Sequence, residues 1–289
     1  MNTIKEKFIL VILGGLLFFN VFAWIVVYNL NYPKFLEVNF FDVGQGDAIL
    51  IQTPKRHQIL IDGGPSSIVL EKLAKEMPFW DRTIDLIVLT HPEKDHLAGL
   101  IDVLKRYEVE NILWTGVVRD NPEFKEWEEL IEKEGANIKI AKAGQRIILP
   151  INKEEADIDI LYPFEKLEGK EIENSNETSI VSRLIFGEIS FLFTADVSKA
   201  TEKKIFEKET VKSDVLKVAH HGSKTSSSEN FIEKVLPKIA VIQVGKDNSY
   251  GHPNQETLDI LEKYGISIFR TDKNNDIKIL CDSQLLKLK

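Results

Sequence analysis

The amino-acid sequence predicts an α/β fold, a sandwich of two sheets covered by helices, preceded by one transmembrane helix. Three observations lead to this prediction: an uncharged run near the N-terminus, strands that alternate with amphipathic helices from Leu36 onward, and a second, mixed half that contains a hairpin. The hydrophobic content of 43% is ordinary for a chain that buries a core, so intrinsic disorder is excluded.

The N-terminal run, Phe8 to Tyr28, contains no charged residue and as a helix would span about 31 Å, enough for the hydrocarbon core of a bilayer. A cleavable signal peptide is the main alternative, but the run is long for one and no A-x-A-like cleavage site precedes Pro33. We therefore expect residues 1–32 to be an uncleaved, single-pass anchor in the cell membrane. Lys5 and Lys7 favour an N-terminus inside the cell and an extracytoplasmic location for the rest.

Short β-branched and aromatic segments bounded by turn residues mark the strands, and apolar residues at helical spacing mark the helices. The predicted strands are Leu36–Asp42, Ala48–Thr53, Gln58–Ile61, Ile84–Leu89, Ser179–Phe186, Ile189–Thr194, Val215–Ala219 and Ala240–Val244. The predicted helices are Leu97–Tyr107, Glu123–Glu134, Glu229–Leu236 and Gln255–Tyr264. The polar, acidic segment Pro150–Ser175 is predicted to be a connection.

Charge and cysteine content limit the possible functions. The formal net charge of −8 argues against a long groove that tracks a nucleic-acid backbone, but permits a short phosphate substrate at a site that carries cations. The single cysteine, Cys281, excludes an internal disulfide and a cysteine-rich zinc site. Any metal must therefore be held by histidines and carboxylates.

One segment supplies such ligands at high density. The strand ending at Leu89 leads into Thr90-His91-Pro92-Glu93-Lys94-Asp95-His96, and a helix follows. Strand ends before a helix are where α/β folds place ligand sites, and Pro92 keeps His91 out of the helical conformation. The alternative is that the two histidines are capping or surface residues.

The segment resembles the H-x-H-x-D-H signature of the metallo-β-lactamase fold, with Glu93 in place of the second histidine. Further motifs resemble the branch formed by the hydrolase domain of ComEC, the competence DNA-uptake proteins. They are Phe41-Asp42-Val43-Gly44-Gln45-Gly46-Asp47, Leu60-Ile61-Asp62-Gly63-Gly64, Phe193-Thr194-Ala195-Asp196, His220-His221-Gly222-Ser223 and Tyr250-Gly251-His252-Pro253. The resemblance covers Leu36 to the C-terminus and implies an αββα sandwich of two mixed sheets over 33–289, without the multi-helix channel of those proteins.

The resemblance also implies two metal ions. His91 and Glu93 would bind the first; Asp95 and His96 would bind the second, which His220, or failing it His221, would complete. Asp196 would bridge the two ions. Oxygen ligands favour Mn²⁺ and imidazoles suit Zn²⁺, so either metal is expected. The first ion lacks a further histidine, for which the chain offers only the region around Asn176.

Several residues are expected to support the metals or the reaction. Asp62 would orient a metal-bound histidine, unless it only forms a turn, and Asn176 would lie in the same outer layer of contacts. Asp95 and His252 are the candidate catalytic residues, with His252 as proton donor or phosphate contact. His57 is expected to be an exposed turn residue without a role.

A loop rich in hydroxyl groups and the two lysines near the motifs suggest substrate contacts. Hydroxyls and a cation before a helix favour a phosphate, although capping of the helix by one serine explains the loop equally well. The candidate substrate-binding residues are Asp47, Lys94, His221, Ser223, Lys224 and Ser227.

The sequence therefore predicts a membrane-anchored, dinuclear metal-dependent hydrolase in which a hydroxide bridging the metals attacks a phosphodiester, possibly of nucleic acid. Two alternatives stay open: hydrolysis of a different ester, a lactone or a cell-envelope substrate, and a tethered scaffold without activity. No protein partner is indicated.

Overall fold

A computed structural model describes residues 2–30, 35–151 and 154–289. The chain divides into two compact units, residues 1–34 and 35–289. Each unit is described by itself.

The first unit contains one helix, α1 (Asn2–Leu30), as the uncharged run predicts. Its segment Lys5–Val27 has a mean hydropathy of 2.6 and is long and apolar enough to cross a membrane. Large apolar side chains such as Phe8 and Phe19 are exposed all along it (66% and 68%). By length and composition, the helix is thus a candidate membrane span.

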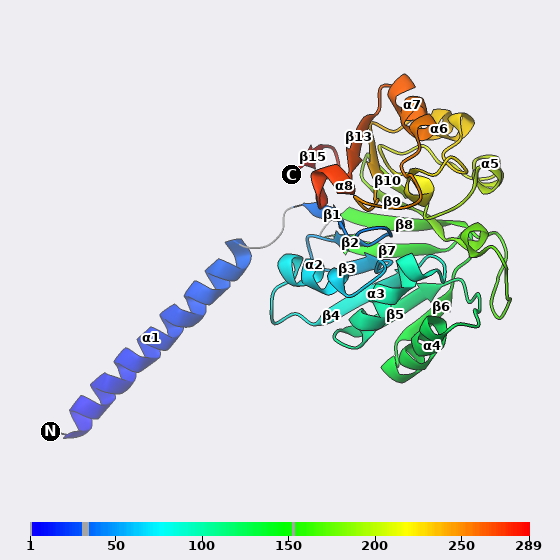
Figure 1. Ribbon diagram of the computed structural model, residues 1–289. Coiled ribbons are helices and arrows are strands. Elements are labelled where there is room, and N and C mark those ends of the chain that lie inside the picture. The colour runs from blue at the N-terminus through cyan, green and yellow to red at the C-terminus, as the bar shows by residue number, and fades with distance from the viewer. Residues whose placement is uncertain (1, 31–34, 152–153) are drawn as a thin grey trace. The chain divides into compact units, whose positions relative to one another are not determined.

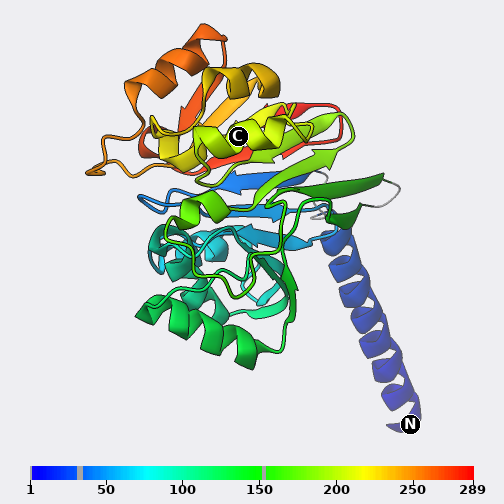
Figure 2. The same ribbon diagram turned by 90° about the vertical axis from the view of Figure 1, so that its right-hand side faces the viewer.

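The second unit is built on two mixed sheets (Figures 1 and 2). In the described part of the chain, the first sheet has the strand order β15-β14-β1-β2-β3-β4-β5-β6. Its strands are β1 (Leu36–Phe40), β2 (Ile49–Gln52), β3 (Gln58–Ile61), β4 (Thr83–Leu89), β5 (Glu108–Trp114), β6 (Asn137–Ile140), β14 (Ile277–Cys281) and β15 (Leu286–Leu288). Strands β3 to β6 are parallel neighbours, and the other neighbours in the sheet are antiparallel.

The second sheet has the order β13-β12-β11-β10-β9-β8-β7. Its strands are β7 (Arg146–Ile151), β8 (Glu154–Tyr162), β9 (Val181–Phe186), β10 (Ile189–Phe193), β11 (Val215–Lys217), β12 (Ile239–Ile242) and β13 (Ser267–Arg270). Strands β7 to β10 pair antiparallel, and β10 to β13 pair parallel. The expected pair of mixed sheets is therefore confirmed.

Three helices pack on the outer face of each sheet, which completes the αββα layering (Figures 1 and 2). Helices α2 (Ile68–Glu76), α3 (Lys94–Leu104) and α4 (Pro122–Glu134) cover the first sheet; α5 (Lys199–Phe206), α6 (Glu229–Val235) and α7 (Gln255–Lys263) cover the second. The shorter helices are η1 (Ser175–Thr178), η2 (Ala219–Gly222) and α8 (Thr271–Asn274).

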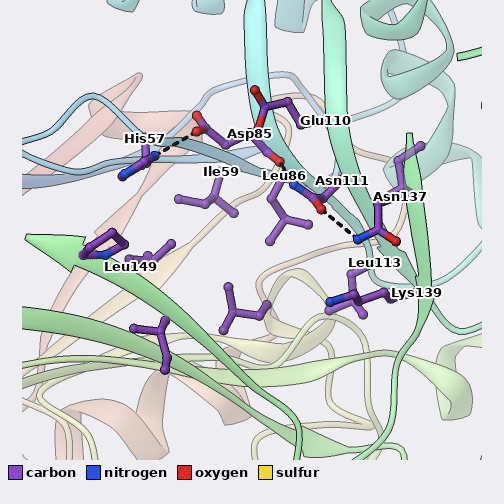
Figure 3. Close-up of a pocket in the computed structure, with 14 residues that line it drawn as sticks. His57, Ile59, Asp85, Leu86, Glu110, Asn111, Leu113, Asn137, Lys139 and Leu149 are labelled. Carbon is purple, nitrogen blue, oxygen red and sulfur yellow. Dashed lines mark hydrogen bonds and ion pairs between the residues drawn. The ribbon is translucent and has the colours of Figure 1, made fainter. Parts of the chain in front are cut away.

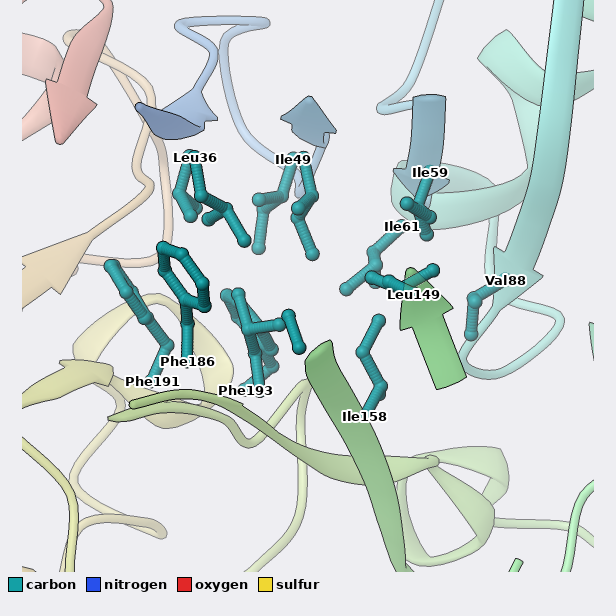
Figure 4. Close-up of a cluster of buried hydrophobic side chains, with 14 of the residues drawn as sticks. Leu36, Ile49, Ile59, Ile61, Val88, Leu149, Ile158, Phe186, Phe191 and Phe193 are labelled. Atoms are coloured by element: carbon teal, nitrogen blue, oxygen red, sulfur yellow. The ribbon is translucent and has the colours of Figure 1, made fainter. Parts of the chain in front are cut away.

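The main core lies between the two sheets (Figure 4). Aliphatic side chains of the first sheet, such as Ile49 and Ile59, face Phe191 and Phe193 of the second, and all four are at most 2% exposed. Because side chains of a strand alternate between its faces, every second residue enters this core and the others pack under the helices.

The prediction that Pro150–Ser175 is only a connection is wrong, because this segment contains strand β8. In β8, Ala156 and Ile158 are buried while Asp157 lies half-buried between them. The carboxylate of the next acidic residue, Asp159, pairs with Arg146 of β7. The alternating acidic residues make the segment look polar overall, which hides the strand from a reading of composition.

The two sheets bring the motif-bearing segments to one end of the sandwich. Strands β3 and β4 are parallel and end just before Asp62 and His91, and β10 and β11 are parallel and end just before Asp196 and His220. The carboxyl ends of parallel strands share an edge of the sheet, so these residues come from four strand ends that meet.

Candidate metal centre

His91 and His96 flank the turn between β4 and the start of α3. Both rings are fully buried and their centroids lie 4.1 Å apart. The Nδ1 atom of His91 is 3.0 Å from the hydroxyl of Thr90, and the Nε2 atoms of both histidines have no hydrogen-bond partner. A buried imidazole nitrogen without a partner is costly, so both nitrogens indicate a ligand that protein atoms do not supply.

Four side chains form one group of potential ligands: Asp95, His96, Asp196 and His221, whose ligand atoms all lie within 4.8 Å of one another. Asp196 Oδ2 is 3.5 Å from His96 Nε2 and 3.6 Å from His221 Nε2, and Asp95 Oδ2 is 3.3 Å from His221 Nε2. Two ligand atoms that are each about 2.1 Å from a tetrahedral ion lie about 3.4 Å apart. The spacing therefore fits a divalent ion held by two imidazoles and two carboxylates.

Of the two adjacent histidines, the structure places His221 in this group. His221 is buried, whereas His220 is 29% exposed and its Nε2 lies 3.7 Å from Asp196 Oδ2, at the edge of the group. The sequence analysis preferred His220. Both residues have positive φ angles, 49° and 52°, so the chain turns sharply after β11 and brings the second ring inward.

Asp62 holds His96 in the orientation that a metal requires. Its Oδ2 accepts hydrogen bonds from His96 Nδ1 (2.8 Å) and from the hydroxyl of Thr90 (2.7 Å). This contact directs the free Nε2 toward the group. The close approach depends on glycine, because a Cβ atom on Gly99 of α3 would lie 1.9 Å from the carbonyl oxygen of Gly63.

Lys217 is a functional candidate that the sequence analysis missed. It is 1% exposed, forms an ion pair with Asp47, and its Nζ lies 3.8 Å from Asp196 Oδ1. Burial alone would raise the pKa of Asp47, but Lys217 and His221 lower it below its ordinary value. The signal that could have found Lys217 is that it is the one charged residue in the otherwise apolar run Val215–Ala219.

Asp47 itself lies beneath the group and not in contact with solvent, because its side chain is 2% exposed and is enclosed by Lys217 and His221. Asp47 is therefore not among the residues that line the cavity, and its contact with substrate stays a prediction. Its backbone N–H donates to the carbonyl of Asp95, 3.2 Å away, so the residue fixes the position of a ligand.

Glu93 does not belong to the group. Its carboxylate is held by Arg119 and by the hydroxyl of Ser175, and Arg119 also donates to the backbone carbonyl of Glu173. His91 therefore lies beside His96. Glu93, which the resemblance gave as the second ligand of the same ion, instead forms an ion pair with Arg119 at the rim.

A polar cavity of about 310 Å³ opens above the group. Its lining contains Asn176 and His252, and in full consists of Gln45, Glu93, Asp95, Glu173, Asn174, Ser175, Asn176, Asp196, His220, His221, Tyr250 and His252. The ring of His252 stacks against Tyr250 with centroids 5.8 Å apart and lies 5.6 Å from that of His220. Burial and the neighbouring His220 lower the pKa of His252 to about 4, so it is neutral at pH 7.

Of the other predicted substrate-binding residues, His221 lines the cavity, and Lys94, Ser223 and Lys224 do not. Lys94 is 70% exposed and its Nζ lies 3.4 Å from Glu123, outside the cavity lining. Ser223 bonds to Thr225, and Lys224 is exposed. None of these three residues lines the cavity.

The hydroxyl-rich loop already holds an anion of the protein itself. The carboxylate of Glu202 accepts hydrogen bonds from the backbone N–H groups of Ser227 and Ser228 and from the Ser228 hydroxyl. Ser228 also accepts a hydrogen bond from Phe231 and caps α6. Glu202 thus already accepts from the backbone N–H of Ser227, and a phosphate contact at Ser227 stays a prediction.

A second cavity, of about 250 Å³, lies between strands β3 to β6 and β7 (Figure 3). It contains none of the four clustered ligands. His57 lies there, half-buried, with its Nδ1 atom 2.8 Å from Asp85, and Asn137 donates to Asn111. Because the clustered potential ligands lie at the other cavity, that cavity is the candidate active site.

The donor set fits a divalent ion, since two of the four ligands are carboxylates and Asp196 Oδ1 is buried without a hydrogen-bond partner. Burial alone would lower the pKa of His221, but Asp196 and Asp47 raise it to about 9. A metal must therefore displace a proton from this group, and its affinity rises with pH.

Residues 41–246 match the model of the metallo-β-lactamase superfamily, so this chain belongs to that superfamily of metal-dependent hydrolase fold. It is similar to the ComE operon protein 3 of Bacillus subtilis (31% identical over 260 residues, 84% of this chain and 32% of that protein). It is also similar to the competence protein ComA of Neisseria gonorrhoeae (31% identical; 81% of this chain and 31% of that protein). The chain thus spans about a third of the length of these relatives, and the resemblance stated from the motifs is confirmed.

Solved structures agree on the fold. Tm1679, described as a metal-dependent hydrolase of the β-lactamase superfamily, superimposes with a TM-score of 0.50 over 87% of this chain and 98% of its own, at 15% identity. The CmlA β-hydroxylase E377D mutant gives a TM-score of 0.53 over 86% of this chain and 54% of its own, at 14% identity.

Proposed function

We propose that this protein is a membrane-anchored, metal-dependent hydrolase that cleaves phosphodiesters, with nucleic acid as the leading substrate. The observation that carries the proposal is the group Asp95, His96, Asp196 and His221 at the base of a polar cavity. Nucleic acid is favoured because relatives that share most of this chain are named as competence proteins.

The ion would be held by these four side chains. When bound, Zn²⁺ or Mn²⁺ would act as a Lewis acid toward a phosphoryl oxygen and make water a better nucleophile at neutral pH. Asp62 keeps the Nε2 atom of His96 directed at the ion, and Lys217 neutralises part of the buried carboxylate charge. His252, neutral at the cavity wall, would donate a hydrogen bond to a leaving-group oxygen.

A second ion remains part of the proposal. The buried, unpaired Nε2 atom of His91 is available beside His96 to coordinate this second ion. Glu93 would join it only by leaving Arg119. Metal analysis of the purified protein tests this directly: near two ions per chain supports the pair, and near one leaves Glu93 in its ion pair.

The anchor places the reaction at the cell membrane. Helix α1 is the proposed single-pass span, and Lys5 and Lys7 before its apolar core favour an extracytoplasmic catalytic unit.

The decisive experiment measures hydrolysis by the full-length protein in detergent with Zn²⁺ or Mn²⁺. Asp196→Ala removes a ligand and is expected to abolish both metal binding and hydrolysis of a single-stranded oligonucleotide. Asp62→Asn keeps the ligands but should weaken metal affinity about 10- to 100-fold. Asp259→Ala, an exposed carboxylate on α7, is the matched control and should behave as the wild type. Full activity in Asp196→Ala would refute the assignment.

A neutral ester or lactone is the second candidate. The cavity lining carries the carboxylates of Glu93, Asp95 and Glu173, which repel a polyanion unless bound metal compensates for them. Assaying the same preparations with a lactone and with a generic phosphodiester separates the two. A metal-loaded protein that cleaves neither would favour a tethered scaffold.

A further inference from the structure

Two consecutive aromatic side chains stand exposed on the second unit. Phe79 and Trp80 lie in the loop between α2 and β4, are 81% and 67% exposed, and pack edge to face with ring centroids 4.8 Å apart. The two rings contact each other. Exposed apolar side chains of this size are costly in water, and adjacent ones indicate a surface that another phase or molecule covers.

Strand register shows at which end of the sandwich this loop lies. The loop residue Asp81 accepts a hydrogen bond from Gln58, the first residue of β3. Gln58 pairs with Gln52 at the end of β2, and Gln52 pairs with Glu37 near the start of β1. Phe79 and Trp80 therefore lie at the end of the sheet where β1 begins.

A further exposed apolar residue shares this end. Leu285, 68% exposed, lies in the hairpin between β14 and β15, and Cys281 before that hairpin pairs with Leu36, the first residue of β1. In Figure 1 the cyan loop after α2 and the red C-terminal hairpin lie on the same side of the unit.

The candidate active site lies at the opposite end. Strand β4 starts at Thr83, beside the aromatic loop, and runs through Leu89 to His91. Seven residues of strand cover about 20 Å or more. The two features are thus separated by the length of the sheet.

The sequence connects α1 to the aromatic end. Leu30 is the last residue of α1 and Leu36 the first of β1, so six peptide units join them. Six fully extended units span at most about 22 Å. The length of the connecting chain therefore keeps the start of β1 within about 22 Å of the end of the proposed anchor.

We propose that Phe79, Trp80 and Leu285 dock on the membrane interface and hold the active-site cavity facing away from the bilayer. Tryptophan and phenylalanine favour the boundary between headgroups and acyl chains, where apolar rings leave water. The inference rests on the proposed function, because it requires that α1 anchors the chain. It deepens that proposal in one respect: a substrate must arrive from the aqueous phase, since the cavity opens at the far end from the lipid.

The test uses the full chain reconstituted in vesicles of phosphatidylcholine and phosphatidylglycerol, with acyl chains brominated close to the headgroups as quenchers. The chain has four tryptophans; Trp114 and Trp127 are at most 8% exposed, so Trp24 and Trp80 are the two that lipid can reach. In Trp24→Phe, brominated lipid should remove the emission of Trp80. In the double variant Trp24→Phe/Trp80→Phe it should remove none. Unchanged hydrolysis of a soluble substrate by both variants shows that they are folded.

The remaining outcomes overturn the inference and identify the part that fails. Quenching of Trp24 in the wild type without quenching of Trp80 in Trp24→Phe would leave the anchor intact and refute docking. Absence of both would refute the anchor as well. If aqueous iodide quenches Trp80 in vesicles, the loop stands in water; if neither iodide nor lipid reaches it, a protein surface covers it. Either result contradicts docking on lipid.

Discussion

Lys217 illustrates how single residues shape the site. A buried ammonium is costly unless it is paired, and this one lies between the carboxylates of Asp47 and Asp196. It offsets charge that four clustered ligands alone would leave uncompensated. Asp62 acts similarly through geometry, since it fixes one nitrogen of His96 and leaves the other for a ligand.

Replacing Lys217 by Met should lower the free energy of unfolding by about 3–5 kcal/mol, because Asp47 would remain buried without its partner. The double variant Lys217→Met/Asp47→Asn should recover part of this loss. Denaturant unfolding followed by tryptophan fluorescence measures both. Lys238→Met, on the surface, should change stability by less than about 1 kcal/mol. Equal stability of Lys217→Met and wild type would show that Asp47 does not need the pair.

At the scale of elements, α5 supplies the anion at the start of α6 that the sequence analysis expected to be a phosphate. Glu202 of α5 satisfies the amide groups of Ser227 and Ser228 that a phosphate would otherwise bind. Burial raises the pKa of Glu202 to about 7. The hydrogen bonds from Ser227 and Ser228 lower this pKa, but by less than burial raises it. The carboxyl group of Glu202 is therefore partly protonated at pH 7.

This gives a pH-dependent stability with a definite sign. Because the folded pKa of about 7 exceeds the ordinary value of 4.5, the native state binds a proton that the unfolded state has released. Stability should therefore fall as pH rises from about 4.5 to 7, by on the order of 3 kcal/mol. Glu202→Gln should flatten that slope.

The measurement is the free energy of unfolding between about pH 3.5 and about pH 8, one unit beyond each end of that window, with chelator present. It compares wild type, Glu202→Gln and the exposed control Glu229→Gln. Parallel curves for wild type and Glu202→Gln would contradict a raised pKa for Glu202.

At the scale of the whole molecule, the candidate metal joins the two halves of the sandwich. Asp95 and His96 follow a strand of the first sheet, while Asp196 and His221 follow strands of the second. An ion held by all four would add a link between two layers that the apolar core (Figure 4) and polar contacts such as the Lys217–Asp47 ion pair already join.

Metal binding should therefore raise the melting temperature. At a free metal concentration of 100 times Kd the native state gains about 2.7 kcal/mol, which for a domain of this size is a shift of about 5–10 °C. Differential scanning fluorimetry with added Zn²⁺ or Mn²⁺ measures the shift. Asp196→Ala should show none, and a wild type that melts equally with metal and with chelator would contradict the site.

The sequence predicted the fold well where the signal is local. The apolar residues Leu86–Leu89 of β4 and the histidines and carboxylates after them need no distant partner to be recognised, and the family follows from them. Strand β8 escaped because its acidic residues alternate with the apolar ones, so composition outweighed periodicity.

The sequence by itself determined the class of protein: an apolar N-terminal helix, an αββα sandwich, and histidines and carboxylates at strand ends. Only the tertiary structure decided how those side chains are used. It brought His221 and not His220 into the group, paired Glu93 with Arg119, and placed Glu202 where a phosphate was expected. The physical reason is that each of these contacts joins segments far apart in the chain, and which side chain turns inward depends on backbone turns and sheet packing that residue types alone do not specify.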